Sequence, residues 1–234
     1  MRGPLQPPVA ELLDYLRAIG FEDLYLSQPT DPANRVEAVE STRRLGSDER
    51  ARELEALATR AAGCTLCPLS EQRHKVVFGT GDPNADLMFI GEGPGAEEDR
   101  QGLPFVGRAG ELLNKIIQAI DLTREQVYIA NIVKCRPPGN RDPQAEEVAA
   151  CRPYLEGQID SIQPKVIVLL GKVAAQTLLG TDYTLGRMRG QWYHVRGVET
   201  RVTYHPAALL RNASFKRPTW EDMQIIRDRL SEQS

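Results

Sequence analysis

The chain has 234 residues and a formal net charge of −3, a length that allows one sizeable hydrophobic core with an appended segment. No apolar run is long enough to span a bilayer, and residues 1–8 lack the apolar core of a signal peptide. We therefore expect a cytoplasmic protein without membrane contact. Residues 1–60 carry 8 Lys and Arg against 11 Asp and Glu, whereas residues 61–234 carry 21 against 21. A nucleic-acid partner would have to meet a local basic patch, because the overall charge does not attract one.

The first sixty residues resemble a helical extension rather than part of the core. Val9–Ile19 has the pattern of a short amphipathic helix that ends at Gly20. Ser47 is the expected cap of a second helix. The apolar positions of this second helix are Leu54, Leu57 and Ala61. Docking onto a protein partner is the alternative role for residues 1–60, and it would rest on Leu12, Leu13, Leu16 and Phe21.

Residues 61–234 alternate between short apolar runs and helical patterns, which predicts a separate catalytic domain of the α/β class. Strands are expected at 87–90, 127–132, 166–170 and roughly 198–204. Helices are expected near 109–120, 144–159 and 172–180. The nearly continuous apolar strands at 87 and 166 are typical of central parallel strands, which are buried on both faces. We therefore predict a three-layer α/β/α fold with a mostly parallel four-stranded sheet.

The stretch Leu87–Gly110 predicts a site at the end of a strand. A glycine-rich loop follows the first strand and leads into a helix, which is how an open α/β sheet builds a binding site. The loop holds glycines and carboxylates at Gly91, Glu92, Gly93, Gly95, Glu97, Glu98 and Asp99. A dinucleotide-binding fingerprint is a poor alternative, because the third glycine comes one position early. A plain solvated loop is the other alternative, and Phe105 argues against it.

A phosphate-binding loop at Gly171-Lys172 is rejected. It lacks the upstream glycine, and Val173 stands where Ser or Thr should bind magnesium.

Four cysteines form a plausible ligand set: Cys64 and Cys67 in a C-x-x-C-P sequence, then Cys135 and Cys151. In a cytoplasmic chain, four such cysteines bind metal more often than they form disulfides. Zinc usually takes two short C-x-x-C pairs, whereas an iron–sulfur cluster tolerates dispersed thiolates. The spacing therefore favours a [4Fe–4S] cluster but leaves zinc open.

The segment after the last strand begins with His205-Pro206. His205 ends a strand at the same sheet edge as the glycine loop. The residues that follow are two exposed-looking leucines and three basic residues: Leu209, Leu210, Arg211, Lys216 and Arg217. Apolar residues flanked by basic ones suit a loop that enters a DNA duplex and contacts phosphates.

Taken together, these motifs resemble the family 4 uracil-DNA glycosylases, which are iron–sulfur members of the uracil-DNA glycosylase superfamily. The resemblance rests on Gly91–Asp99, Pro104–Gly107, Asn131–Pro138, the four cysteines and His205–Ala207. It covers about residues 60 to 230 and does not extend over the first sixty. It implies a [4Fe–4S] cluster on the four cysteines, which the spacing alone did not decide.

The resemblance implies that uracil is flipped out of DNA and cut from its sugar, leaving an abasic site. Phe105 would stack on the flipped base, and Asn131 would recognise its Watson–Crick edge. Gly93 and Gly95 would bring backbone N–H groups to the base, and His205 would donate a hydrogen bond to uracil O2 as it gains charge. No lysine is placed as an amine nucleophile. The substrate would be single- or double-stranded uracil-containing DNA, bound by a monomer.

The resemblance also implies roles for residues that contact DNA and for the carboxylates of the glycine loop. Leu209 would fill the gap left by the base, and Arg211 would contact the backbone. The loop departs from the Gly-Gln-Asp-Pro-Tyr sequence of the best-known relatives, as family 4 does, and therefore lacks the usual Asp that activates water. Glu92 is expected to orient the loop or the water, and Glu98 to lie against the C5 side of the pocket. A structural hydrogen bond is the alternative for each.

Two other functions compete with this interpretation. One superfamily branch binds uracil-DNA covalently through a histidine, but residues 132–150 contain no histidine. The other is an iron–sulfur DNA-binding or redox protein without turnover, which would not need Asn131 or His205 in a pocket.

Overall fold

The computed structural model describes residues 46–233, and its centre is a six-stranded sheet in the order β1-β3-β2-β4-β6-β5. The strands are β1 Thr80–Gly81, β2 Leu87–Gly91, β3 Tyr128–Asn131, β4 Val166–Leu170, β5 Trp192–Val195 and β6 Val198–Thr203. The four inner strands are parallel and match the four expected ones. The edge strands β1 and β5 pair antiparallel, so the expected count of four strands is wrong by these two.

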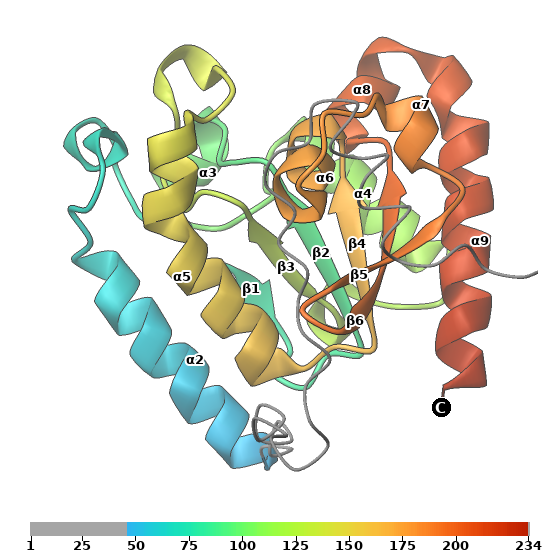
Figure 1. Cartoon of the computed structure of the whole chain (residues 1–234), viewed down its shortest axis with the longest axis horizontal. Coiled ribbons are helices and arrows are strands. Elements are labelled where there is room, and N and C mark those ends of the chain that lie inside the picture. The colour runs from blue at the N-terminus through green and yellow to red at the C-terminus, as the bar shows by residue number, and fades with distance from the viewer. Residues whose placement is uncertain (1–45, 234) are drawn as a thin grey trace, which may run out of the picture. The chain divides into compact units, whose positions relative to one another are not determined.

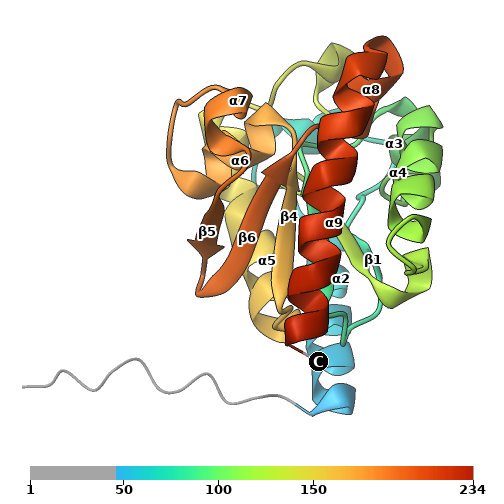
Figure 2. The same cartoon turned by 90° about the vertical axis from the view of Figure 1, so that its right-hand side faces the viewer.

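Helices cover both faces of the sheet, which confirms the three-layer α/β/α fold (Figure 1). They are α2 Ser47–Ala62, α3 Ala96–Gln101, α4 Arg108–Gln118, α5 Ala145–Ile162, α6 Lys172–Leu179, α7 Leu185–Met188, α8 Pro206–Arg211 and α9 Lys216–Glu232. Short 3-10 helices are η2 Pro68–Glu71, η3 Arg124–Gln126, η4 Pro138–Asn140 and η5 Ala213–Phe215. Figures 1 and 2 show α9 on one side of the sheet and α2 and α5 on the other. In the described part of the chain, no helix has the length and apolar character needed to cross a membrane.

Strand β2 shows why the layers form. Its residues alternate between the two sides of the sheet. Leu87 and Phe89 pack with residues of α4 and α9, whereas Met88 and Ile90 pack with residues of α2, α5 and α6. All four are at most 1% exposed, which is why the strand is a continuous apolar run in the sequence.

Helix α2 belongs to one of these layers. Its N-cap is Gly46 and has no side-chain cap, so the expected cap by Ser47 is wrong; Ser47 Oγ instead accepts a hydrogen bond of 2.9 Å from Asn84 Nδ2. A Cβ added to Gly157 of α5 would lie 3.0 Å from Leu57, so the glycine lets the two helices approach closely. The boundary expected at residue 60 falls inside α2. The helix predicted at Val9–Ile19 lies outside the described residues.

The four parallel strands end at one edge of the sheet, near α3, α6 and α8 (Figure 1). The glycine loop follows β2, and Asn131 is the last residue of β3. Gly171 follows β4, and His205 follows β6 after one intervening residue. This edge is where the sequence predicts a site.

Candidate active site

An open cleft of about 690 Å³ lies at this edge of the sheet. Its lining includes eight of the residues predicted to act on the substrate: Glu92, Gly93, Gly95, Glu98, Phe105, Asn131, His205 and Arg211. These residues come from the ends of β2, β3 and β6 and from the segments that follow them. The cleft volume is within the range of small-molecule sites.

Asn131 lines the cleft, and within residues 46–233 the acceptor oxygen of its amide is buried without a partner. The residue is 1% exposed, and its Oδ1 has no hydrogen-bond partner among the described residues. A Cβ added to Gly91, its neighbour in β2, would lie 2.5 Å from Oδ1 and 2.7 Å from Phe105 Cζ. Gly91 therefore allows the amide and the ring to meet. A buried acceptor without a partner costs about 1–3 kcal/mol, so this atom is suited to a ligand that donates a hydrogen bond.

Phe105 is held in the cleft by an unusual backbone conformation. Its φ is +51°, a left-handed value that is uncommon for a bulky residue. Arg124 stabilises this turn, since its Nη1 donates to the Phe105 carbonyl at 3.1 Å and its Nη2 donates to the Pro104 carbonyl. A Cβ on Gly110 would lie 1.9 Å from the Phe105 carbonyl oxygen, so only glycine fits beneath the turn. The ring is therefore a rigid face rather than a mobile side chain.

His205 lies beside this ring, with the two ring centroids 5.4 Å apart. Its Nδ1 accepts a hydrogen bond of 3.1 Å from the Ala207 N–H, which assigns the proton of the neutral ring to Nε2. Burial lowers the pKa of His205 to about 4, and the nearby charge of Arg211 acts in the same direction. His205 is therefore a neutral hydrogen-bond donor at neutral pH.

Glu98 binds the loop backbone with both of its carboxylate oxygens. Oε2 accepts from the Gly95 N–H at 3.1 Å, and Oε1 accepts from the Val106 and Gly107 N–H groups at 3.0 Å each. This is the structural hydrogen bonding that the sequence left open as an alternative. It also occupies the Gly95 N–H, which is consequently not free to reach a ligand. Glu98 fastens the glycine loop to the segment that enters α4.

Glu92 lines the cleft without such bonds. Burial raises the pKa of its carboxyl to about 7, and the nearby charge of Asp142 raises it further. A carboxyl group with a pKa near the working pH is suited to exchanging a proton during a reaction. Asp142 follows η4 and also lines the cleft, a contribution that the sequence did not indicate.

The four cysteines line a second, smaller pocket. Cys64 and Cys67 lie between α2 and η2, Cys135 follows β3, and Cys151 lies in α5. All four are free thiols. Two sulfurs accept N–H hydrogen bonds, Cys151 from the Lys134 backbone at 3.2 Å and Cys135 from Arg73 Nη1 at 3.4 Å.

Within residues 46–233, no three or more His, Cys, Asp or Glu side chains are arranged to hold a metal ion. A zinc ion would draw four sulfurs to about 2.3 Å from one centre. The four thiols that line one pocket, two of them with N–H donors, form a donor set that suits a group held by several thiolates.

The comparisons with known proteins agree with this geometry. The sequence model of the Uracil DNA glycosylase superfamily matches residues 78–224. A Type-4 uracil-DNA glycosylase of Sulfurisphaera tokodaii is 43% identical over 184 residues, which cover 75% of this chain and 84% of the relative. That of Thermotoga maritima is 44% identical over 177 residues, with 73% and 91% covered. The chain belongs to the type-4 uracil-DNA glycosylases. A Type-5 enzyme of Pyrobaculum aerophilum is 33% identical over 164 residues, with 62% and 71% covered.

One residue assigned from the resemblance to this family lies elsewhere than expected. Leu209 is 3% exposed, whereas Leu210 is 44% exposed. The expectation that both leucines are exposed is therefore wrong for Leu209. The reason is that residues 206–211 form helix α8, which packs against α4, so consecutive side chains point in different directions. Leu210 and Arg211 are the exposed residues of α8.

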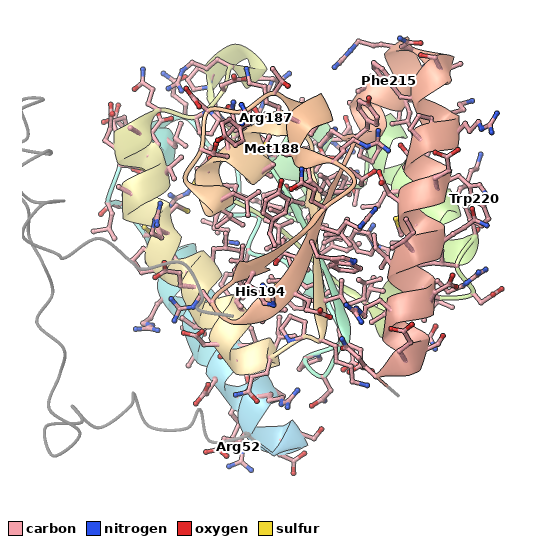
Figure 3. All side chains as sticks on the ribbon, turned by 45° about the vertical axis from the view of Figure 1, so that its right-hand side comes forward. Arg52, Arg187, Met188, His194, Phe215 and Trp220 are labelled. Atoms are coloured by element: carbon pink, nitrogen blue, oxygen red, sulfur yellow. The ribbon has the colours of Figure 1, made fainter. Side chains whose placement is uncertain are left out.

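Two aromatic residues of the cleft were missed. Tyr204 and Phe215 both line it, and their rings stack with centroids 4.2 Å apart and planes at 10°. Arg189 lies over the Tyr204 ring, 4.6 Å from its centroid. Figure 3 shows Phe215 near the top of α9, at the sheet edge that carries the cleft, and His194 lower down on β5. The local sequence does not indicate that Tyr204 and Phe215 are in contact. Prediction of the helix that begins at residue 216 would have been needed to find this contact.

Proposed function

We propose that the protein removes uracil from DNA by hydrolysing the bond between base and sugar, which releases free uracil and leaves an abasic site. The observation that carries this proposal is the unpaired Oδ1 of Asn131, buried in a cleft beside Phe105 and His205. Uracil offers the matching donor at N3. A base must leave the helical stack to reach such a cleft, at a cost of roughly a few kcal/mol.

Selectivity for uracil follows from the amide of Asn131. Its Oδ1 accepts the N3–H of uracil, and its Nδ2 donates to O4, while the Phe105 ring supports the face of the base. Cytosine has an acceptor at N3 and a donor at the O4 position, so both contacts would oppose like groups. Mismatches of this kind reject a competitor by about 10⁴-fold or more.

Cleavage creates negative charge on uracil, and His205 is placed to receive it. As the bond between base and sugar breaks, the electron pair moves onto the base, much of it to O2. The Nε2–H of neutral His205 donates to this oxygen more strongly in the transition state than in the ground state. The Gly93 N–H assists from the glycine loop, while Gly95 is engaged by Glu98.

Glu92 accepts the proton of the attacking water in this proposal. Its raised pKa of about 7 means that the carboxylate form predominates above pH 7. Because only the carboxylate can accept a proton, kcat of the wild type should rise with pH and level off above about 7. Glu92→Gln is expected to remove this rise of kcat with pH and to lower kcat by about 10²-fold or more.

The pH profile of Asp142→Asn provides the matched control for Glu92. The charge of Asp142 helps to raise the pKa of Glu92. Neutralising Asp142 should therefore shift the midpoint of the rise of kcat with pH to lower pH without removing that rise. A Glu92→Gln variant with the wild-type profile of kcat against pH would exclude Glu92 as the base.

Contact with DNA is assigned to the exposed end of α8. Leu210 replaces Leu209 as the residue that fills the space left by the flipped base, because it is the exposed leucine of α8 and precedes Arg211, which lines the cleft. Arg211 lies next to it, and the exposed Lys216 and Arg217 follow at the start of α9. This local group of cations meets the requirement for a basic patch.

A [4Fe–4S] cluster is the proposed cofactor, held by Cys64, Cys67, Cys135 and Cys151. It would supply a structural link between the segment after α2, the loop after β3 and α5. Protein purified without oxygen should be brown and contain about four irons per chain. Cys135→Ser should lose iron in elemental analysis. Zinc in place of iron in the wild type would overturn the assignment.

Oligonucleotides with and without uracil, followed by alkali, test the function itself. Strand breaks at uracil alone support the glycosylase in both single- and double-stranded substrates. A protein–DNA band that resists denaturant would indicate the covalent branch, and binding without either product would indicate a DNA-binding protein. The cytoplasmic location, the monomeric state and a protein partner for residues 1–60 stay predictions.

A further inference from the structure

Lys134 is a buried lysine between the cysteine pocket and the cleft, and none of the steps above uses it. It is 1% exposed and lines the cysteine pocket. Its Nζ donates a hydrogen bond of 2.9 Å to the backbone carbonyl of Asn131 and a second one to Gln158 Oε1. Burial of a lysine costs free energy unless its donors are satisfied, so these two acceptors determine where the side chain lies.

Gln158 is itself fixed in one arrangement. It is 0% exposed, and its Nε2 donates to the Phe78 carbonyl at 2.9 Å and to the Tyr128 hydroxyl at 3.1 Å. A Cβ on Gly79 would lie 2.9 Å from Nε2 and 2.8 Å from the hydroxyl. The backbone at Gly79 thus approaches this network closely, and both ends of the Gln158 amide are hydrogen-bonded. Lys134 therefore holds the Asn131 carbonyl from a rigid support.

The backbone of Lys134 is held by two hydrogen bonds of its own. Its N–H donates to Cys151 Sγ at 3.2 Å, and its carbonyl accepts from the Val77 N–H at 2.8 Å. From this fixed position the side chain reaches back three residues to Asn131. One residue thus contacts both a cysteine of the proposed cluster site and the residue that recognises uracil.

Asn131 needs such support, because its side-chain acceptor has no protein partner in the cleft. The direction of Oδ1 consequently depends on packing beside Gly91 and Phe105 and on the position of the main chain. On one side, Gly91 accepts from the Ile132 N–H at 2.9 Å. On the other side, the carbonyl of Asn131 is bound by Lys134 Nζ.

We propose that Lys134 is a positioning residue that orients Asn131 toward uracil by binding its carbonyl from the Gln158 network. The inference rests on the proposed function. Without the ammonium group, the Asn131 carbonyl and Gln158 Oε1 would be buried acceptors without a donor, and the end of β3 would move to satisfy them. The loss should then appear as weaker discrimination at uracil N3 rather than as a general loss of folding.

The test compares binding of free uracil and 3-methyluracil by calorimetric titration of iron-loaded protein. The methyl group removes the N3–H donor, so the ratio of the two dissociation constants measures the contribution of Asn131. Lys134→Met keeps the length of the side chain and removes its donors. We expect the preference for uracil to fall by about tenfold or more, with an unchanged iron content.

Tyr128→Phe is the matched control. It removes a hydroxyl from the same buried network but leaves both acceptors of Lys134 Nζ in place. It should lower Tm and leave the preference for uracil at the wild-type value. A Lys134→Met protein with the wild-type preference would overturn the inference, and so would one that loses its iron together with its preference.

Two further outcomes keep the inference open to refutation. If Lys134→Met does not fold, Gln158→Met is the second variant, because it removes one of the two acceptors that hold Lys134 Nζ. A lowered preference of this variant for uracil over 3-methyluracil supports the proposal. A wild-type preference refutes it. A wild-type protein that does not prefer uracil, or does not cut uracil-DNA, would instead refute the proposed function.

Discussion

His205→Ala is expected to lower kcat for uracil excision by about 10²–10³-fold, the usual effect of losing one donor to a developing oxyanion. The donor is the Nε2–H, because Nδ1 is occupied by the Ala207 N–H. The interaction strengthens as charge reaches O2, so the loss should fall on kcat more than on KM. Single-turnover rates on a uracil-containing duplex measure the chemical step without product release.

The pKa of His205 adds a second expectation. Because burial lowers this pKa to about 4, the ring stays neutral as the pH falls to about 5 and becomes charged only below about 4. The contribution of His205 to the rate should therefore be constant between pH 5 and 8. His194→Ala is the control, since His194 is exposed on β5. Equal rates for His205→Ala and His194→Ala would remove His205 from the site.

Asn131→Ala is expected to lower kcat/KM for uracil by about 10³-fold, since two buried hydrogen bonds of about 2 kcal/mol each are lost. Its selectivity for uracil over cytosine should shrink with it, because the alanine no longer opposes the polar edge of cytosine. The variant should melt at or above the wild-type Tm. The reason is that the substitution removes a buried acceptor without a partner, whose burial costs about 1–3 kcal/mol.

Asn84→Ala is the control for this experiment. Asn84 is exposed in the loop before β2, and its amide contacts Ser47 rather than the cleft. Its kcat/KM should equal that of the wild type. An Asn131→Ala enzyme that keeps full activity on uracil would refute the assignment, and one that loses activity together with its Tm would point to a structural role for Asn131.

The strands of the sheet were predictable where their burial requires a recognisable run of apolar residues. Strands β2 and β4 are buried on both faces and appear as apolar runs. Strand β5 is half exposed and has a polar residue among its four, and strand β1 has only two residues. Neither strand therefore shows a detectable alternation of apolar and polar residues. Helix α9 was missed because Pro218 lies in its first turn and its mean composition is polar. Its buried residues Met223 and Ile226 are the signal that a helical search would have found.

The site was predictable for residues whose position follows from a strand end, as with Asn131 and His205. Leu209 was not, because the phase of a helix decides which of two adjacent leucines is buried. Glu98 carried an available signal, since it stands three residues after the N-cap Gly95 and forms the capping interaction. Lys134 had none, because its hydrogen bond joins it to Gln158, which is 24 residues away in the chain.

A crystal structure of the iron-loaded protein with free uracil would show whether these three side chains bind the base together. We expect uracil N3 at about 2.7–3.2 Å from Asn131 Oδ1, with the base against the Phe105 ring and O2 facing His205 Nε2. Uracil bound elsewhere, or bound in the cleft with Oδ1 of Asn131 still unpaired, would contradict it.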